Sequence, residues 1–303
     1  MTRPTRDTPD GRAYQDVRNL ARRDGRDVAE YLTLYALEGF LARLAASPHA
    51  DDFVLKGGVL MAAFAARRPT RDIDLAASGF PNDVDEVVMR VGGIIRFDAG
   101  DGLMFDPASV AGVPIRDEAD YTGVRVKVAA SLATARIALH VDVNFGDPIW
   151  PAPTQAEVPR LLGGSVRLKG YPDHMVLAEK IVTAVERGTA NTRWRDFVDI
   201  VALSQTRTIR MSDMAEAIRT VAAYREASLR PLDEVLDGMA SLAQAKWVNW
   251  RRKQRLDDST PEQFQELLDQ VIRFADPALE GTAELTWTPE SQAWRAVSVS
   301  STM

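Results

Sequence analysis

Two aspartates that alternate along a predicted strand are the residues whose types and spacing point most directly to chemistry. Asp72 and Asp74 lie two positions apart in RDIDLA, so a strand there places both carboxylates on one face. Carboxylate oxygens suit Mg²⁺, which keeps other coordination positions for water and phosphate. The pair is therefore predicted to bind a divalent cation, Mg²⁺ or Mn²⁺, together with a substrate that carries phosphates.

A pair of glycines lies upstream of these aspartates, between a predicted strand and a predicted helix. Gly57 and Gly58 follow Lys56, and thirteen residues separate Gly58 from Asp72. Glycine N–H groups at a helix N-terminus can approach a phosphate, and the helix dipole favours the anion. Lys56, Gly57, Gly58 and Arg71 are therefore predicted to contact the phosphates of a nucleotide.

A third carboxylate is expected from a neighbouring strand. In ALHVDVNFGD, Asp142 shares a face with His140, opposite the apolar Val141 and Val143. Asp142 is predicted to be the third metal ligand, or the base that receives the proton of an attacking hydroxyl group. Asp147, just after the strand, is the less favoured choice.

Two further charged clusters lie later in the chain. Lys180 and Arg187 share one face of a predicted helix and can reach phosphates, although a solvated basic face is the default interpretation. Asp196 and Asp199 lie one turn apart near the start of the next predicted helix, after Arg193. These carboxylates either complement the helix dipole or orient Lys180 or a nucleotide amine.

The elements that must position these residues follow from periodicity and turn residues. The first part is predicted to contain helices over 12–46, 59–66 and 82–91, a turn at 67–70, and strands over 52–55, 71–76, 94–97, 123–131 and 136–145. The later part is predicted to be helical over 173–188, 193–204, 212–224, 231–253 and 261–275, with a tail (276–303) that is either a strand pair or loose. The class is therefore α+β, with a mixed-sheet domain over 1–168 and a mainly helical domain over 169–303.

Composition narrows the possible functions. The 303 residues include no cysteine and three histidines, which excludes disulfides, thiol catalysis and Cys-ligated metal sites. No apolar run approaches the ~20 residues of a membrane span, and the polar N-terminus does not read as a signal peptide. We expect no membrane association and a cytoplasmic location. The net charge of −6 requires any nucleic-acid contact to use a local basic patch.

The ordered set of motifs is specific enough to suggest a family. The matching stretches cover roughly residues 15–205: LARRDGRDVAEYLTLYALEGFLARLAAS, FVLKGGVLMAAF, RRPTRDIDL, IALHVDVNFGDPI, YPDHMVLAEKIVTAVERG and NTRWRDFVDI. The chain resembles the AbiEii/AbiGii-type toxins, including the MenT toxins, which belong to the nucleotidyltransferase superfamily with a polymerase-beta-like fold. The resemblance implies catalytic roles for Asp72, Asp74, Lys180 and Asp196, metal binding by Asp72 and Asp74, and nucleotide contacts by Gly57 and Gly58.

The resemblance also implies a function. Toxins of this kind transfer nucleotides, preferentially pyrimidines, to the 3′ end of tRNA and so block aminoacylation. The expectation is a monomeric nucleotidyltransferase toxin that uses an NTP, with CTP favoured, and has a cognate antitoxin. The alternatives are transfer to a protein or small-molecule hydroxyl group, or a catalytically silent binding protein. One departure from the family pattern is Arg195, where the family often has lysine.

Two further segments carry weaker hypotheses. A basic run with two tryptophans is a candidate RNA-binding surface. Its candidate contacts are Lys246, Trp250, Arg251, Arg252, Lys253 and Arg255. The alternative is that the tryptophans are core residues and the cations form a solvated face. Thr70, two residues before Asp72, is a candidate regulatory phosphorylation site, because a phosphate there would place negative charge beside the metal site.

Overall fold

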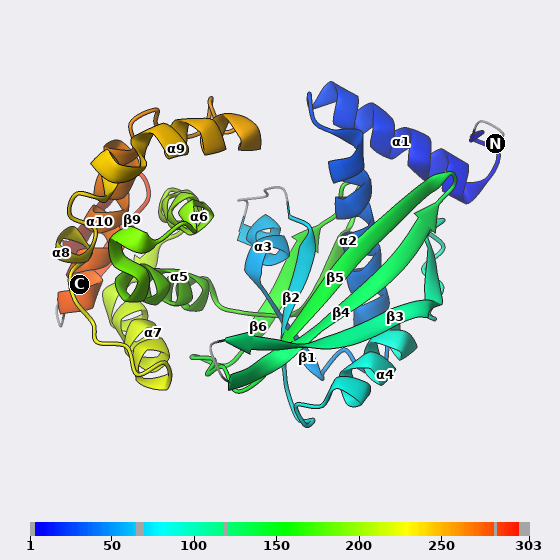
Figure 1. The fold of residues 1–303 in the computed structure, drawn as a ribbon, viewed down its shortest axis with the longest axis horizontal. Coiled ribbons are helices and arrows are strands. Elements are labelled where there is room, and N and C mark those ends of the chain that lie inside the picture. Colours follow the sequence, from blue (N-terminus) through cyan, green and yellow to red (C-terminus); the bar gives the residue numbers. More distant parts are fainter. Residues whose placement is uncertain (1–3, 65–69, 118–119, 282–283, 297–303) are drawn as a thin grey trace, which may run out of the picture. The chain divides into compact units, whose positions relative to one another are not determined.

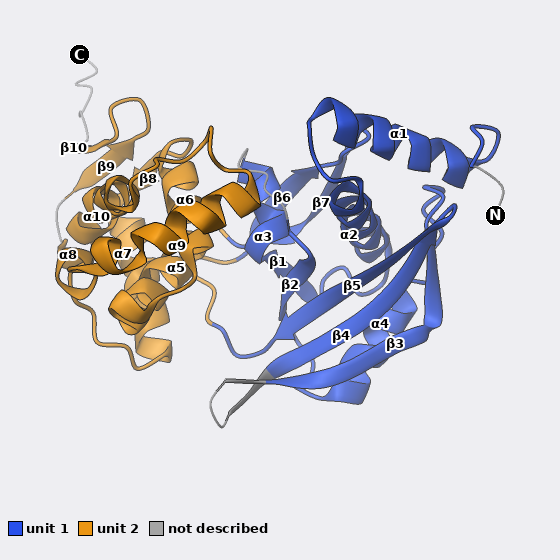
Figure 2. Cartoon of the chain, turned by 45° about the horizontal axis from the view of Figure 1, so that its top comes forward, with its two compact units in different colours: residues 1–147, 153–171 blue, residues 148–152, 172–303 orange. Residues whose placement is uncertain are grey.

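The computed structural model describes residues 4–64, 70–117, 120–281 and 284–296, which form two compact units (Figures 1 and 2). Unit 1 is Met1–Asp147 with Pro153–Tyr171, and unit 2 is Pro148–Ala152 with Pro172–Met303. The expected domain division at 168/169 falls within a strand of unit 1.

Unit 1 is built on a seven-stranded mixed sheet in the order β3-β4-β5-β2-β1-β7-β6. The β2 strand lies near the middle, antiparallel to β1 and parallel to β5. The strands are β1 (Phe53–Lys56), β2 (Asp72–Ala77), β3 (Met104–Asp117), β4 (Asp120–Leu132), β5 (Ala135–Asn144), β6 (Thr154–Pro159) and β7 (Ser165–Gly170).

The two faces of this sheet differ because side chains alternate along each strand. One face is apolar, with Ile73 and Leu75 of β2 beside Val141 and Val143 of β5, all fully buried. The helices α1 (Pro9–Arg23), α2 (Val28–Ala46) and α4 (Val84–Ile94) pack against strands of the sheet (Figure 2). The alternate positions, which include Asp72, Asp74 and Asp142, therefore lie on the opposite, polar face.

The predicted single helix over 12–46 is wrong, because two helices occupy this region. Gly25 adopts a φ of +62° in the turn between α1 and α2. Asp27 then caps α2, and its carboxylate accepts a hydrogen bond from the N–H of Ala29 at 2.7 Å. The polar residues of RRDGRD therefore end α1 and begin α2, and they do not form the exposed face of a single helix.

The predicted strand near 94–97 is also wrong, because α4 continues to Ile94 and the next strand begins only at Met104. The β3 strand is the edge of the sheet, which tolerates the prolines within its sequence. The β6–β7 hairpin was not predicted either, and its turn contains Gly163 and Gly164 at positive φ. The predicted helix over 59–66 appears as α3 (Gly57–Leu60) and a 3₁₀ turn (Met61–Phe64), while 65–69 lie outside the described residues.

Unit 2 is mainly helical, as predicted, but also contains a small sheet. Its helices are α5 (Asp173–Arg187), a 3₁₀ turn (Gly188–Ala190), α6 (Trp194–Ser204), α7 (Met211–Tyr224), α8 (Leu232–Val235), α9 (Met239–Gln254) and α10 (Phe264–Glu280). The predicted helix over 231–253 is wrong as one element, since Gly238 at a φ of +74° separates α8 from α9. The small sheet has the order β10-β9-β8, formed by β8 (Ile209–Arg210), β9 (Leu285–Thr288) and β10 (Ala293–Ala296).

The tail therefore forms a strand pair, one of the two predicted alternatives. Trp287 of β9 is 2% exposed, and its indole N–H donates a hydrogen bond to the carbonyl of Ser204 at 2.7 Å. Trp294 of β10 stacks on Phe274 of α10. The rest of the tail, 297–303, lies outside the described residues.

Candidate active site

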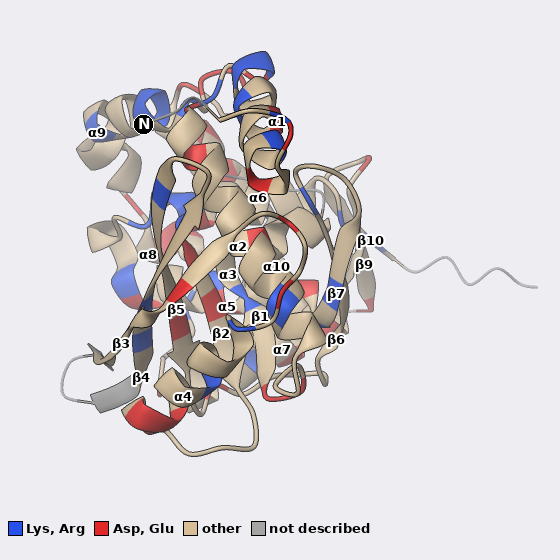
Figure 3. Ribbon diagram, turned by 90° about the vertical axis from the view of Figure 1, so that its right-hand side faces the viewer, with Lys and Arg blue, Asp and Glu red and all other residues tan. Residues whose placement is uncertain are grey.

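A row of four charged side chains crosses the polar face of unit 1. In the strand register, Arg125 of β4 lies opposite Asp142 of β5, Asp142 opposite Asp74 of β2, and Asp74 opposite Lys56 of β1. Acidic and basic residues on these strands are coloured in Figure 3. We call Arg125, Asp142, Asp74 and Lys56 the charged row. The β2–β5 pairing, between strands far apart in sequence, joins the two halves of the row.

The Gly57 backbone lies directly against the Asp74 carboxylate. A Cβ atom on Gly57 would fall 2.0 Å from Asp74 Oδ2, and its φ of +67° favours glycine. The N–H of Gly58 also hydrogen-bonds to Asp74. Because α3 is a single turn, its dipole is small, so phosphate binding here would depend on the nearby N–H groups and cations.

Lys56 forms an ion pair at one end of the row. Its Nζ lies 2.5 Å from Oδ2 of Asp147, and it also lies over the Tyr171 ring. Asp147, the less favoured acidic residue of the sequence analysis, is therefore the ion-pair partner of a predicted phosphate contact.

Asp142 forms a two-pronged ion pair with Arg125 at the other end of the row. Arg125 Nε donates to Oδ1 at 2.8 Å and Nη2 to Oδ2 at 2.6 Å. This hydrogen bonding raises the pKa of Arg125 above its usual value. The predicted third metal ligand thus has both oxygens occupied by a guanidinium group.

The centre of the row carries excess negative charge. Burial raises the pKa of Asp74 above its usual value, and the neighbouring charges of Asp142 and Asp72 raise it further. Lys56 and the Gly58 N–H act in the opposite direction. A divalent cation bound here would compensate the buried charge of Asp74 and would reduce its repulsion by Asp72 and Asp142.

Asp72 is the most accessible carboxylate of the group, with 42% of its side chain exposed. Its Oδ1 lies 3.2 Å from Nδ1 of His140, and Arg71 beside it is exposed. The donor chemistry of Asp72 and Asp74 fits a hard divalent cation held by two carboxylates and completed by water and phosphate oxygens. Within the described ranges, no group of three or more acidic or histidine side chains is arranged as a metal site.

Unit 2 contains a separate buried cluster. Lys180 Nζ on α5 lies 2.6 Å from Asp196 Oδ1 and 2.9 Å from Asp199 Oδ2 on α6. Asp199 is almost fully buried, and Arg193 Nε lies 3.7 Å from Asp196. The predicted association of Lys180 with these carboxylates is thus present in the structure. Arg187, by contrast, is exposed.

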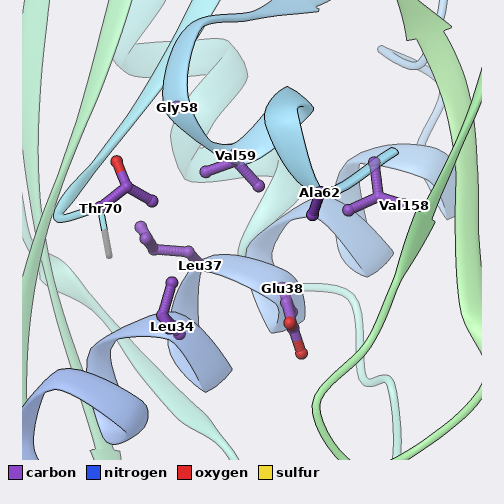
Figure 4. A pocket seen from close by; sticks show the side chains of 8 residues that line it. All are labelled: Leu34, Leu37, Glu38, Gly58, Val59, Ala62, Thr70 and Val158. Atoms are coloured by element: carbon purple, nitrogen blue, oxygen red, sulfur yellow. The ribbon is translucent and has the colours of Figure 1, made fainter. Parts of the chain in front are cut away.

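Thr70 is poorly placed for modification. Its side chain is buried, and its hydroxyl donates a hydrogen bond to the carbonyl of Asp72 at 3.3 Å. It lines a small pocket with Leu34, Leu37 and Val59 (Figure 4). The predicted phosphorylation would need Thr70 to leave this position.

The candidate RNA-binding segment is partly structural. Trp247 is fully buried and stacks on Phe264, as the core-residue alternative predicts. Arg251 is only 11% exposed, and its Nε donates to the Thr260 carbonyl at 3.1 Å. The members that remain exposed to solvent are Lys246, Arg252, Lys253 and Arg255, whereas Trp250 is partly buried.

The site residues that sequence reasoning missed are Arg125, as the partner of Asp142, and His140, as the neighbour of Asp72. Both lie on alternating strands, which places them on a face but does not select their neighbours. Their contacts depend on the register of β4 and β2 against β5.

Comparisons with known proteins identify the family of the chain. A family model described as "Nucleotidyl transferase AbiEii toxin, Type IV TA system" matches residues 39–281, which include Asp72, Asp74 and Lys180. No curated protein matches the chain.

The solved structures to which the chain is similar have low sequence identity and low TM-scores. JHP933 from Helicobacter pylori is 15% identical with a TM-score of 0.45, covering 78% of this chain and 85% of that one. A putative nucleotidyltransferase from H. pylori is 14% identical with a TM-score of 0.46, covering 79% and 88%. An antigenic nucleotidyltransferase-like protein from Paracoccidioides brasiliensis is 15% identical with a TM-score of 0.39, covering 66% and 92%.

The mixed sheet confirms the predicted α+β class, and the family match, which spans well over half of the chain, confirms the predicted family and enzyme class. No helix among the described ranges has the length and apolar character needed to cross a bilayer. The chain belongs to the AbiEii family of nucleotidyl transferase toxins of toxin–antitoxin systems.

Proposed function

We propose that this toxin transfers a nucleotide from an NTP, with CTP favoured, to the 3′-hydroxyl group of tRNA and thereby blocks aminoacylation. The observation that carries the proposal is the Asp72–Asp74 pair on the polar face of the sheet, with Asp72 accessible to solvent and Gly57 against Asp74. The choice of tRNA and CTP rests on the family resemblance alone. The family implies a cognate antitoxin; a monomeric state and a cytoplasmic location are further parts of the proposal.

In this mechanism the residues of unit 1 hold the triphosphate. Asp72 and Asp74 would hold Mg²⁺ or Mn²⁺, which supplies positive charge to the phosphates when bound. Lys56 and Arg71 would add positive charge near the phosphates, and the lack of a side chain on Gly57 lets its backbone lie against the Asp74 carboxylate. The tRNA 3′-hydroxyl group would lose its proton to solvent as its oxygen bonds to the α-phosphorus, and the bond between the α-phosphorus and the departing pyrophosphate would break.

The unit 2 cluster is the second part of the proposal. The family resemblance implies catalytic roles for Lys180 and Asp196, with Asp199 beside them, whereas the nucleotide contacts proposed for Arg187 and Arg193 rest on their positions in the sequence. The ion pairs of Lys180 with Asp196 and Asp199 support a fixed orientation for the lysine ammonium group. Lys180 would then present a positive charge in one defined position.

The test is incubation of purified protein with total tRNA, Mg²⁺ and each labelled NTP in turn. We expect label on tRNA from the wild type, most strongly with CTP, and none from Asp72→Asn. Asp106→Asn is the matched control, because it changes an exposed carboxylate on β3 of the same sheet and should leave transfer intact.

Other outcomes would redirect the assignment. Label on polypeptide or on a small molecule would contradict a tRNA acceptor and favour the alternative hydroxyl acceptors. Label on tRNA from folded Asp72→Asn would contradict the role of the aspartate pair.

A further inference from the structure

We propose that Arg125 sets the metal affinity of the site by holding Asp142 in an ion pair, so that the resting protein offers only Asp72 and Asp74 to a divalent cation. The proposal rests on the metal-binding role proposed for those two aspartates. It makes Arg125 a positioning residue that acts through Asp142 and does not touch the metal.

The geometry of the Arg125–Asp142 pair is the first argument. Two parallel hydrogen bonds of 2.8 and 2.6 Å join the guanidinium fork to the two carboxylate oxygens. Charge-assisted pairs of this kind are directional and stronger than neutral hydrogen bonds. Asp142 is 11% exposed on its side chain, so the guanidinium is its main source of compensating charge. A cation that approached Asp142 would compete with a positive charge already in place.

The charge balance of the site is the second argument. Lys56 forms its ion pair with Asp147, although its charge also acts on Asp74, and Arg125 forms its ion pair with Asp142. Asp72 and Asp74 then remain without a lysine or arginine ion-pair partner among the ion pairs of the described residues. The two aspartates carry two negative charges between them, which match the charge of one divalent cation. Adding Asp142 as a ligand would raise the negative charge of the site, and hence its affinity for metal without nucleotide.

The position of Asp142 is the third argument. It is the direct neighbour of Asp74 in the parallel β2–β5 register, on the same face. Adjacent strands lie about 4.8 Å apart, so a freed Asp142 carboxylate could reach a cation held by Asp74. The Arg125 side chain is 48% exposed, so it can be replaced without leaving a cavity in the core.

The experiment measures Mn²⁺ binding to the nucleotide-free protein by electron paramagnetic resonance. We expect Arg125→Gln to lower the Kd for Mn²⁺ at least fivefold, because Asp142 becomes available. The double variant Arg125→Gln/Asp142→Asn should return to within threefold of the wild type. Asp142→Asn alone should change the Kd less than threefold. Circular dichroism would confirm that each variant is folded.

A matched control separates this effect from a general loss of positive charge. Lys127 is exposed on β4, two residues from Arg125 on the same face, but lies opposite His140 in the strand register. Lys127→Gln therefore removes the same charge without freeing Asp142 and should change the Kd less than twofold.

Three results would overturn the proposal. The first is an unchanged Kd in Arg125→Gln, including no detectable binding in either protein. The second is a gain in affinity that persists in the double variant or is matched by Lys127→Gln. The third is a tenfold loss of Mn²⁺ affinity in Asp142→Asn alone, which would show that Asp142 already binds the metal in the wild-type protein. Because the titration contains no RNA or NTP, it stands even if tRNA proves not to be the acceptor.

Discussion

Two features of the structure require glycine at position 57. Its positive φ is one constraint, and the Asp74 carboxylate against its backbone is a second. A side chain at this position would therefore displace a proposed metal ligand.

We expect Gly57→Ala to abolish nucleotide transfer and to lower the free energy of unfolding by several kcal/mol, because strain and overpacking add. Urea unfolding and the transfer assay would measure the two effects. Gly79→Ala is the matched control, since Gly79 has a φ of +81° but open space around its Cβ position. It should lower stability by only about 1–2 kcal/mol and leave transfer intact. Equal effects of both substitutions would contradict the contact with Asp74.

Lys180 has a proposed catalytic role and also forms ion pairs with the carboxylates of Asp196 and Asp199. Its removal leaves Asp199, 1% exposed, as a buried charge without its lysine partner. Lys180→Met is therefore expected to lower the free energy of unfolding by about 3–5 kcal/mol. Lys180→Arg keeps the charge and should retain most of that stability while changing the transfer rate. If Lys180→Met were as stable as the wild type in urea, the ion pairs would not be structural.

At the scale of elements, the sequence predicted what is local and missed what depends on neighbours. The Asp-x-Asp strand, the helix with Lys180 and the helix with Asp196 were all expected, because alternation and helical periodicity are local signals. The β3 strand and the β6–β7 hairpin were missed, since sheet pairing overrides their prolines and glycines. The Arg125–Asp142 pair was missed because it depends on the register of the β4–β5 hairpin, which is set by a tight turn with Ala133 at a φ of +51°.

The α9 helix illustrates how an element divides a predicted patch into structural and solvent-exposed members. Arg251 holds the loop that follows α9 through Thr260 and Asp257. Arg252 is exposed in the last turn.

We expect Arg252→Glu to weaken tRNA binding severalfold at low salt and to reduce the salt dependence, with stability unchanged. Filter binding over a salt series would measure this. Arg219→Glu, an equal charge change at an exposed position of α7, is the control and should have a smaller effect. If both variants lost tRNA affinity equally, the cause would be net charge, and α9 would not be part of the RNA-binding surface.

At the scale of the whole molecule, the proposed metal site lowers the stability of the protein that contains it. The folded protein raises the pKa of Asp74, chiefly through burial, so it binds more protons at this position than the unfolded chain does. Stability therefore falls as pH rises through the interval between the unfolded and folded pKa values, and remains lower at neutral pH.

Asp74→Asn is accordingly expected to raise the free energy of unfolding of the metal-free protein at pH 7.5, by about 0.5–2 kcal/mol, while abolishing transfer. The gain should shrink as pH falls towards the acidic range, where the carboxylate is protonated in both states. Urea unfolding at several pH values would measure it, with the exposed Asp258→Asn as the control. If Asp74→Asn lowered the free energy of unfolding at pH 7.5, the Asp74 carboxylate would not be destabilising in the folded protein.

The short segment Pro148–Ala152 has a consequence for how the molecule can be divided. It belongs to unit 2 although unit 1 flanks it on both sides, and Trp150 within it packs edge-on against the His174 ring of α5 at 5.8 Å. A cut after Tyr171 leaves this segment on the fragment that carries unit 1, so the fragment 172–303 lacks a piece of its own fold. Such a cut also separates Trp150 from its packing partner on α5, so unit 2 cannot be isolated whole as one continuous stretch of the chain.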